Sequence, residues 1–466
     1  MKRKAILLIS IFTLGNFLLW LVDKIFGDGD GVIAAFNYHP LLFGLISLLA
    51  LGLIILTTHK NLVLSNIGLV LGSLLLALCL GEVLLNFVLP KQGNAETIIL
   101  EGGAFQTKFD TTFFKNYIPG SKFKTRLLMD DMDDYVINEI NSLGIRGPEI
   151  LEKEDSTYRY VFVGDSYLQC DEIIYDSIVG QQVGKLLGHG YEVIQHGIPS
   201  WSPLLEWNWA IKMRPQLKMD GVILFLYYND FIKGDYVGDT GYTKYCTFNE
   251  KHEPVKFDFS GVNKGESSLI KIKNQLRSSR VVQLITQNQA TIFQFDLPPS
   301  QLLLLDSASY NSIEKPNSLM SYLQYGLIDL CRDTSQWDLK LRSRVDTTLN
   351  YLSGFSRWCD RENIDFAIAL IPTPFQLEGE GMGYKKAFGF PEDFTLPRGG
   401  LVDYLHQFSE KNDIPFIPLL DHYRSLKEDH QPLYFNYDLH WNNYGHRVTA
   451  DGIYRFLSTN SMDRDE

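Results

Sequence analysis

The sequence lacks a basic surplus, a cysteine framework and clustered metal ligands, and each shortage excludes a class of function. Lys and Arg number 43 against 55 Asp and Glu, the formal net charge is −12, and no run of five or more basic residues occurs. A nucleic-acid partner is not expected, because phosphate binding needs a basic surface. The five cysteines are widely spaced without a CxxC pair, so we expect no zinc knuckle or disulfide framework. A single isolated disulfide remains an alternative. No metal-ligand spacing is present in the sequence, and we predict neither a metal nor a cofactor.

The first ninety residues, in contrast, are strongly apolar. We expect a membrane anchor over residues 1–90 with three transmembrane helices, at about 5–22, 41–58 and 62–89. A cleaved signal peptide is the alternative for the first segment, but two more apolar stretches follow it and no A-x-A-like cleavage site lies close behind. Basic residues at positions 2–4 and at Lys60 predict a cytoplasmic N-terminus, which places the chain after about residue 90 outside the cytoplasm.

The rest of the chain has the pattern of an α/β domain. Residues 91–157 form a mixed linker or entry segment, and residues 158–460 alternate apolar strands with amphipathic helices, which favours a mainly parallel five-stranded sheet. A polar and aromatic insertion at about 231–340 interrupts this rhythm, and we expect it over the carboxyl ends of the strands, where ligands bind. The expected strands are 158–163, 191–195, 221–227, 365–371 and 415–419, and the expected helices are about 178–187, 204–213, 340–360 and 400–412.

Short motifs after these strands supply groups that acyl transfer needs. Gly164-Asp165-Ser166 directly follows the first strand, where a tight turn exposes a serine hydroxyl. Gly197 follows the second strand, and a glycine there lets a backbone N–H approach a substrate oxyanion. Each motif alone is more simply explained as a turn or a helix cap.

Two further motifs complete the set. Asn229 directly follows the third strand, and its carboxamide can donate to the same oxyanion. Asp438 and His440 lie near the C-terminus, and an imidazole oriented by an acceptor is the general base that a serine nucleophile requires. Taken singly, these residues are more often a turn residue, a solvated loop acid and a structural histidine.

Together the four motifs resemble the SGNH (GDSL-like) hydrolase family, which is named for its Ser, Gly, Asn and His blocks. The similarity covers about residues 158–230 and 365–456 and leaves the insertion unmatched. It implies a three-layer, flavodoxin-like fold and a serine esterase or O-acyltransferase. The implied catalytic residues are Ser166, His440 and Asp438, and the implied oxyanion hole consists of Ser166, Gly197 and Asn229, supported by Gly164 and Asp165.

The acid departs from the common family pattern. Many members place it three residues before the histidine, at Tyr437 here, whereas Asp438 lies two residues before. This D-x-H-W-N variant resembles membrane-linked, polysaccharide-modifying relatives. Arg146, within a turn-like upstream stretch that also resembles such relatives, either lines the site or, as is more common, lies at the surface or in a salt bridge.

These observations lead to one main hypothesis of function and one alternative. The main hypothesis is an ester hydrolase or acyltransferase that acts outside the cytoplasm, through an acyl-serine, on O-acyl (acetyl) groups of envelope polysaccharide; lipid esters are a second substrate class. The alternative is a non-catalytic glycan-binding or scaffold subunit of an envelope-assembly complex, and envelope-assembly partners are compatible with both. The aromatic residues beside the motifs either stack on a sugar ring or simply pack; they are Tyr167, Trp201 and Trp441.

Overall fold

The structure is a computed structural model, and it describes most of the chain beyond residue 94. The described residues are 32–33, 36–37, 61–73, 95–258, 327–382, 395–426 and 431–461, with breaks at 103–105, 111, 128–129, 131, 133, 234–235, 238–241 and 244. The chain divides into two compact units, Met1–Gln92 with Lys264–Asp296, and Gly93–Asn263 with Leu297–Glu466. The second unit contains the central sheet and the predicted site.

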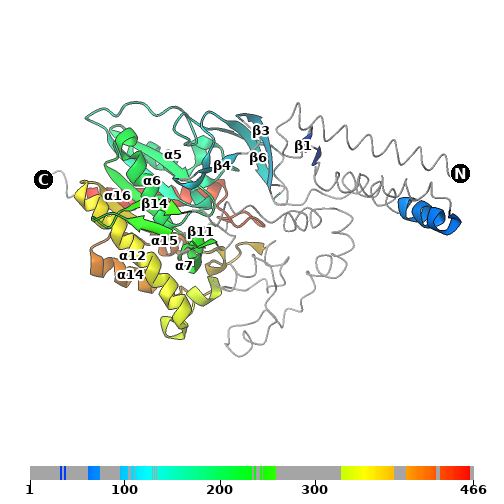
Figure 1. The fold of residues 1–466 in the computed structure, drawn as a ribbon. Coiled ribbons are helices and arrows are strands. Elements are labelled where there is room, and N and C mark those ends of the chain that lie inside the picture. The colour runs from blue at the N-terminus through cyan, green and yellow to red at the C-terminus, as the bar shows by residue number, and fades with distance from the viewer. Residues whose placement is uncertain are drawn as a thin grey trace. The chain divides into compact units, whose positions relative to one another are not determined.

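Five parallel strands form the central sheet (Figure 1). In chain order they are β8 (Tyr158–Gly164), β9 (Tyr191–Gly197), β10 (Gly221–Leu226), β15 (Asp365–Leu370) and β16 (Phe416–Ile417). Their spatial order is β16-β15-β10-β8-β9, which is the 2-1-3-4-5 order of flavodoxin-like folds. Every residue of the central strand β10 is buried, as expected for a parallel strand covered on both faces. The order reverses between β8 and β10, and ligands bind at the carboxyl ends of the strands at such a switch point.

Two groups of helices cover the sheet. The group formed by α5 (Val179–Leu187), α15 (Leu419–Ser425) and α16 (Asn443–Ser461) packs against β9, β15 and β16. The other contains α6 (Pro203–Leu217), α7 (Tyr228–Lys233) and α12 (Leu339–Arg361), and it packs against β8 and β15. The direction of crossover reverses after β9, and right-handed connections then place α5 and α6 on opposite faces. The three-layer, flavodoxin-like arrangement expected for this part of the chain is therefore confirmed.

The sequence periodicity located these elements well. All five expected strands are present, and the expected helices correspond to α5, α6, α12 and α14 (Gly400–Asn412). A polar N-cap marks the start of α12, where the Asp338 carboxylate accepts a hydrogen bond from the Leu341 N–H at 2.6 Å. The apolar periodicity therefore predicted these elements, and in α12 a local side-chain cap also marks where the helix begins.

The entry segment carries antiparallel strands that the sequence patterning did not predict. A three-stranded sheet has the order β3 (Ala95–Glu101), β6 (Lys122–Leu127) and β7 (Val136–Glu139), and β4 (Thr107–Asp110) pairs with β5 (Phe114–Tyr117). These strands are short, and β6 alternates buried with half-buried residues. Lys122, Lys124 and Arg126 occupy the half-buried positions, and Thr125 interrupts the buried ones, so the apolar pattern of the strand is obscured. This segment and the central sheet belong to the same compact unit.

The described part of the insertion contains short strand pairs. They are β11 (Tyr236–Val237) with β12 (Tyr242–Thr243), and β13 (Tyr245–Phe248) with β14 (Pro254–Asp258). Residues 259–326 lie outside the described residues. The short helix η4 (Thr334–Gln336) comes just before α12.

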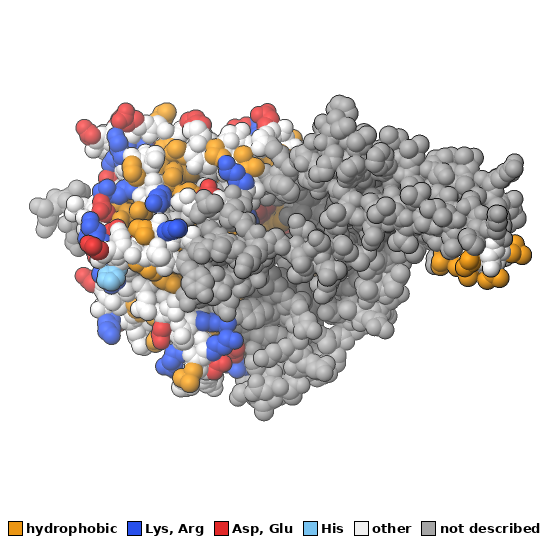
Figure 2. Space-filling model, in the orientation of Figure 1, with side chains coloured by type: hydrophobic (Ala, Val, Ile, Leu, Met, Phe, Trp, Pro, Cys, Tyr) orange, Lys and Arg blue, Asp and Glu red, His pale blue; other side chains and the backbone are white. Residues whose placement is uncertain are grey.

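The first two expected transmembrane helices, and residues 74–89 of the third, lie outside the described residues. Residues 62–73 are helical, and Leu62, Val63 and Val70 are among their exposed apolar side chains (Figure 2). Within the part of the chain that the structure describes, no helix has both the length and the hydropathy needed to cross a membrane. In the first unit the structure also describes two short paired strands, β1 (Val32–Ile33) and β2 (Phe36–Asn37).

Candidate active site

The candidate nucleophile begins a short helix at the end of β8. Ser166 is the first residue of α4 (Ser166–Gln169) and is partly exposed. Asp165 caps this helix, because its carboxylate accepts a hydrogen bond from the Tyr167 N–H at 3.1 Å. A helix leaves its first N–H groups without partners inside the helix. The turn therefore presents both a hydroxyl and a backbone donor at the carboxyl end of the strand.

His440 contacts Ser166 although 274 positions separate them in the chain. The Nε2 atom of His440 lies 2.9 Å from Ser166 Oγ, and Nδ1 forms a short hydrogen bond to Asp438 Oδ1. A carboxylate only accepts hydrogen bonds, so Nδ1 carries a proton, and in its neutral form the ring offers the Nε2 lone pair to the hydroxyl. The three side chains therefore have the relative geometry of nucleophile, general base and orienting acid.

A tight turn brings Asp438 and His440 together. Leu439, between them, has φ of 68°, a left-handed conformation that a leucine adopts only under constraint. The Asp438 Oδ1 atom also accepts the His440 backbone N–H at 3.3 Å. The turn geometry thus replaces the three-residue spacing that is common in the resembled family.

Contacts from other parts of the chain hold this turn. Asp130 of the entry segment accepts hydrogen bonds from the N–H groups of Tyr437 and Asp438, at 2.8 and 3.1 Å. The Tyr167 hydroxyl donates to the Leu439 carbonyl at 2.9 Å. The nucleophile helix and the entry segment therefore both position the base.

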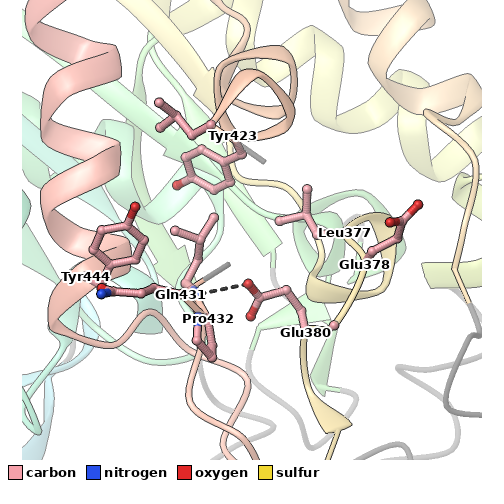
Figure 3. A pocket seen from close by; sticks show the side chains of 10 residues that line it. Leu377, Glu378, Glu380, Tyr423, Gln431, Pro432 and Tyr444 are labelled. Atoms are coloured by element: carbon pink, nitrogen blue, oxygen red, sulfur yellow. Dashed lines mark hydrogen bonds between the residues drawn. The ribbon is translucent and has the colours of Figure 1, made fainter. Parts of the chain in front are cut away.

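A pocket of about 210 Å³ lies between residues 431–433, in the loop that leads to His440, and the turn at residues 377–380 (Figure 3). Glu380 points toward the loop and accepts hydrogen bonds from the N–H groups of Leu433 and Tyr434, at 2.8 and 3.2 Å. Its carboxylate is thus already bound to the backbone. We assign it a structural role in supporting the loop that leads to His440.

The environment of His440 favours its protonated form. Burial disfavours the imidazolium, whereas the Asp438 carboxylate favours it by charge and by hydrogen bonding. The charges of Glu172 and Asp165 also favour the imidazolium, and the net result raises the pKa of His440 to about 9. A general base works only in its neutral form, so this site is better suited to mildly alkaline conditions than to acid ones.

Asn229 and Gly197 lie against the turn of the nucleophile. Asn229, in the first turn of α7, donates from Nδ2 to Asp165 Oδ2 at 2.9 Å, which leaves one amide hydrogen for another acceptor. Gly197 pairs in register with Gly164 at the strand ends. A Cβ on Gly197 would lie 2.5 Å from the Asp165 carbonyl oxygen, so no side chain fits there. The residues of all four sequence motifs therefore lie close to the turn at Asp165 and Ser166.

The expectation that Arg146 is exposed or salt-bridged was wrong. Its side chain is 6% exposed, and it donates hydrogen bonds to the carbonyls of Cys170, at 2.7 Å, and Ile173. These carbonyls flank the turn that follows α4. Arg146 therefore fixes a backbone segment beside the site, which a one-dimensional pattern does not reveal.

The aromatic residues beside the motifs are packing residues. Exposure is 0% for Trp201, 1% for Trp441 and 3% for Tyr167, so no ring face is available for a sugar. Cys170 is likewise buried, and burial raises the pKa of its thiol, which makes it a poor nucleophile.

Sequence reasoning missed Glu172 and Asp130 altogether, and it named Arg146 without predicting its buried bonds to the backbone. Glu172 has one carboxylate oxygen within 4.8 Å of both an Asp438 oxygen and a His440 ring nitrogen. For Glu172, the only signal in the sequence was its position a few residues after Ser166. Many surface turns carry a carboxylate at such a position, so this signal does not point to a catalytic site.

No protein-family description and no curated protein matches this sequence. Solved structures do align. One, described as a lipolytic protein of the G-D-S-L family from Desulfitobacterium hafniense, has 9% identity and a TM-score of 0.30, over 65% of this chain and 100% of that chain. A catalytic mutant of an acetylxylan esterase from Geobacillus stearothermophilus has 12% identity and a TM-score of 0.30, over 66% and 96% of the respective chains. One described as an acylhydrolase from Bacteroides fragilis has 12% identity and a TM-score of 0.31, over 67% and 92%. At these scores the matches do not establish a family, and the site geometry alone carries the function proposed below.

Proposed function

We propose that this chain is a serine ester hydrolase or O-acyltransferase that works through an acyl-serine intermediate. The observation that carries the proposal is the contact of 2.9 Å between Ser166 Oγ and His440 Nε2, with Asp438 bound to the other ring nitrogen. An imidazole held between a hydroxyl and a carboxylate is what general-base activation of a serine requires.

The reaction proceeds in two acyl-transfer steps. His440 Nε2 takes the proton of Ser166 as Oγ attacks the ester carbonyl, and a tetrahedral oxyanion forms. Donors at Ser166 N–H, Gly197 N–H and Asn229 Nδ2 stabilise this charge. The C–O bond to the leaving alcohol then breaks, His440 returns the proton to that alcohol, and an acyl-Ser166 remains.

The second step distinguishes the two activities. His440 removes a proton from the incoming hydroxyl, whose oxygen attacks the acyl carbonyl. The bond between the acyl carbon and Ser166 Oγ then breaks, and His440 returns the proton to Oγ. Water as this nucleophile gives a hydrolase, and a sugar hydroxyl gives a transferase. We propose short acyl esters, above all acetyl groups, on envelope polysaccharide as the substrate, outside the cytoplasm, because the apolar N-terminal segments predict that location for the site.

Labelling with a fluorophosphonate probe tests the activated serine. The purified full-length chain should label in a time-dependent way, whereas Ser166→Ala should not label and His440→Ala should label far more slowly. Ser142→Ala is a matched control, because Ser142 is an exposed serine whose hydroxyl binds Glu149. Absence of labelling in a well-folded wild type would contradict the proposal and favour the glycan-binding alternative.

Acetate release and acetyl transfer test the substrate. Incubation with an O-acetylated polysaccharide should release acetate, and addition of a deacetylated glycan should divert acetyl groups to it if the chain is a transferase. Both activities should disappear in Ser166→Ala. Labelling of Ser166 without either activity would leave the serine enzyme intact and refute the polysaccharide substrate.

A further inference from the structure

A second carboxylate faces the catalytic imidazole. Glu172, Asp438 and His440 each offer one oxygen or nitrogen atom, and these three atoms all lie within 4.8 Å of one another. All three residues are partly buried. An opposite charge at such a distance typically changes a pKa by about one to three units.

The turn that carries Glu172 is rigidly held. The guanidinium of Arg146 binds carbonyls on both sides of it, as described above. The neighbouring Asp171 carboxylate accepts hydrogen bonds from the Tyr117 hydroxyl and from Gln169 Nε2, each at 2.6 Å. The backbone of Glu172 therefore cannot easily move its carboxylate away from His440, unlike that of an acid in a mobile surface loop.

The two carboxylates differ in origin. Asp438 belongs to the same turn as His440 and moves with it. Glu172 follows the helix that begins with Ser166. Its charge therefore reaches His440 from the segment that carries the nucleophile. Burial, and after it the charge of Asp438, raises the pKa of Glu172 to about 7, and the charge of His440 opposes this rise. Close titrating groups such as these gain and lose protons in coupled steps.

We propose that Glu172 is a second carboxylate partner of His440, which stabilises the imidazolium formed when Ser166 loses its proton and so sets the pH range in which the base works. This role rests on the proposed function, in which His440 is the general base. Glu172 acts through His440 and is a positioning residue in the electrostatic sense: it need not touch the substrate.

Other charged or titratable groups around this cluster remain the same when Glu172 alone is changed. They are Asp165 beside Ser166, Asp171 on the turn of Glu172, Asp130 and Arg146 from the entry segment, and His446 from α16. His446 is fully buried, and burial, followed by the charges of Arg146 and His440, lowers its pKa to about 3. It is therefore neutral near pH 7 and does not compete for the proton.

Titration of His440 itself tests the proposal. The full-length chain, with ¹⁵N-labelled histidine side chains, is titrated in the wild type and in Glu172→Gln, and His440→Ala assigns the signal. We expect two inflections in the wild-type His440 curve. In Glu172→Gln we expect a single one, with the pKa lower by about one unit or more because one negative charge is gone. Glu152→Gln, a matched loss of one carboxylate at a site whose side chain is 86% exposed, should leave the curve unchanged.

Coincident His440 curves in Glu172→Gln and the wild type would overturn the proposal, as would an equal shift in the Glu152→Gln control. If Glu172→Gln does not fold, as judged by circular dichroism, Glu172→Asp takes its place. It keeps the charge but withdraws it by one methylene, so the pKa of His440 should fall by a smaller amount, and an unchanged pKa refutes the proposal. Fluorophosphonate labelling separates the two failures: a wild type that does not label refutes the proposed function, while the titration still decides whether Glu172 acts on His440.

Discussion

Replacement of Asn229 by alanine should abolish most turnover while the fold survives. The Asn229 side chain makes one hydrogen bond among the described residues, to Asp165, and its Oδ1 atom has no partner there. Loss of that bond should lower the free energy of unfolding by about 1–3 kcal/mol. Loss of an oxyanion donor, in contrast, typically reduces kcat by a factor of about 10² to 10³.

Asn208 offers a closely matched control for this experiment. It is 1% exposed, its Nδ2 donates to the Thr112 carbonyl at 2.8 Å, and its Oδ1 likewise has no partner among the described residues. Asn208→Ala thus removes the same chemical group and the same number of hydrogen bonds outside the site. Its stability should fall by a similar amount, and its kcat should stay within about twofold of the wild type.

The assay is hydrolysis of a chromogenic acetate ester, with urea unfolding measured on the same samples. A kcat for Asn229→Ala within threefold of the wild type would refute the oxyanion role of Asn229. Equal losses of activity in the two variants would show that buried hydrogen bonding, and not charge stabilisation at Ser166, explains the effect.

Three further predictions concern the base, the close backbone contact and the turn that bears the acid. The rate of fluorophosphonate labelling should rise about tenfold per pH unit below the His440 pKa of about 9 and level off above it, because only the neutral ring accepts the proton; a plateau already reached at pH 7 would contradict this. Gly197→Ala should cost about 1–3 kcal/mol of stability and at least tenfold in kcat, because its Cβ overlaps backbone atoms. Gly184→Ala in α5, where the Cβ meets Val193 at 3.7 Å, should gain up to about 1 kcal/mol and keep full activity, as thermal unfolding and ester hydrolysis will show. Asp130→Ala should lower kcat by roughly 10- to 100-fold, because the acid-bearing turn loses two backbone hydrogen bonds; unchanged kcat in a folded variant would exclude a role in positioning the base.

The sequence by itself determined the α/β class and indicated which residues are the candidate nucleophile, base and acid. Long apolar runs such as Gly221–Leu226 fix their own secondary structure, because a strand buried on both faces needs every residue apolar. Gly164-Asp165-Ser166 could be recognised because turn, cap and nucleophile are adjacent in the chain. Asp438 and His440 could be recognised for the same reason, since two positions separate them.

Only the tertiary structure decided what surrounds these residues. The strand order β16-β15-β10-β8-β9 brings the ends of β8 and β10 together, so that Asp165 and Asn229 can bond across 64 positions of the chain. The roles of Arg146, Asp130 and Glu172 depend on the same kind of long-range contact, and each of these residues looks like an ordinary charged residue in the sequence. A charge acts through distance and burial in three dimensions, and neither of these is written in the local sequence around it.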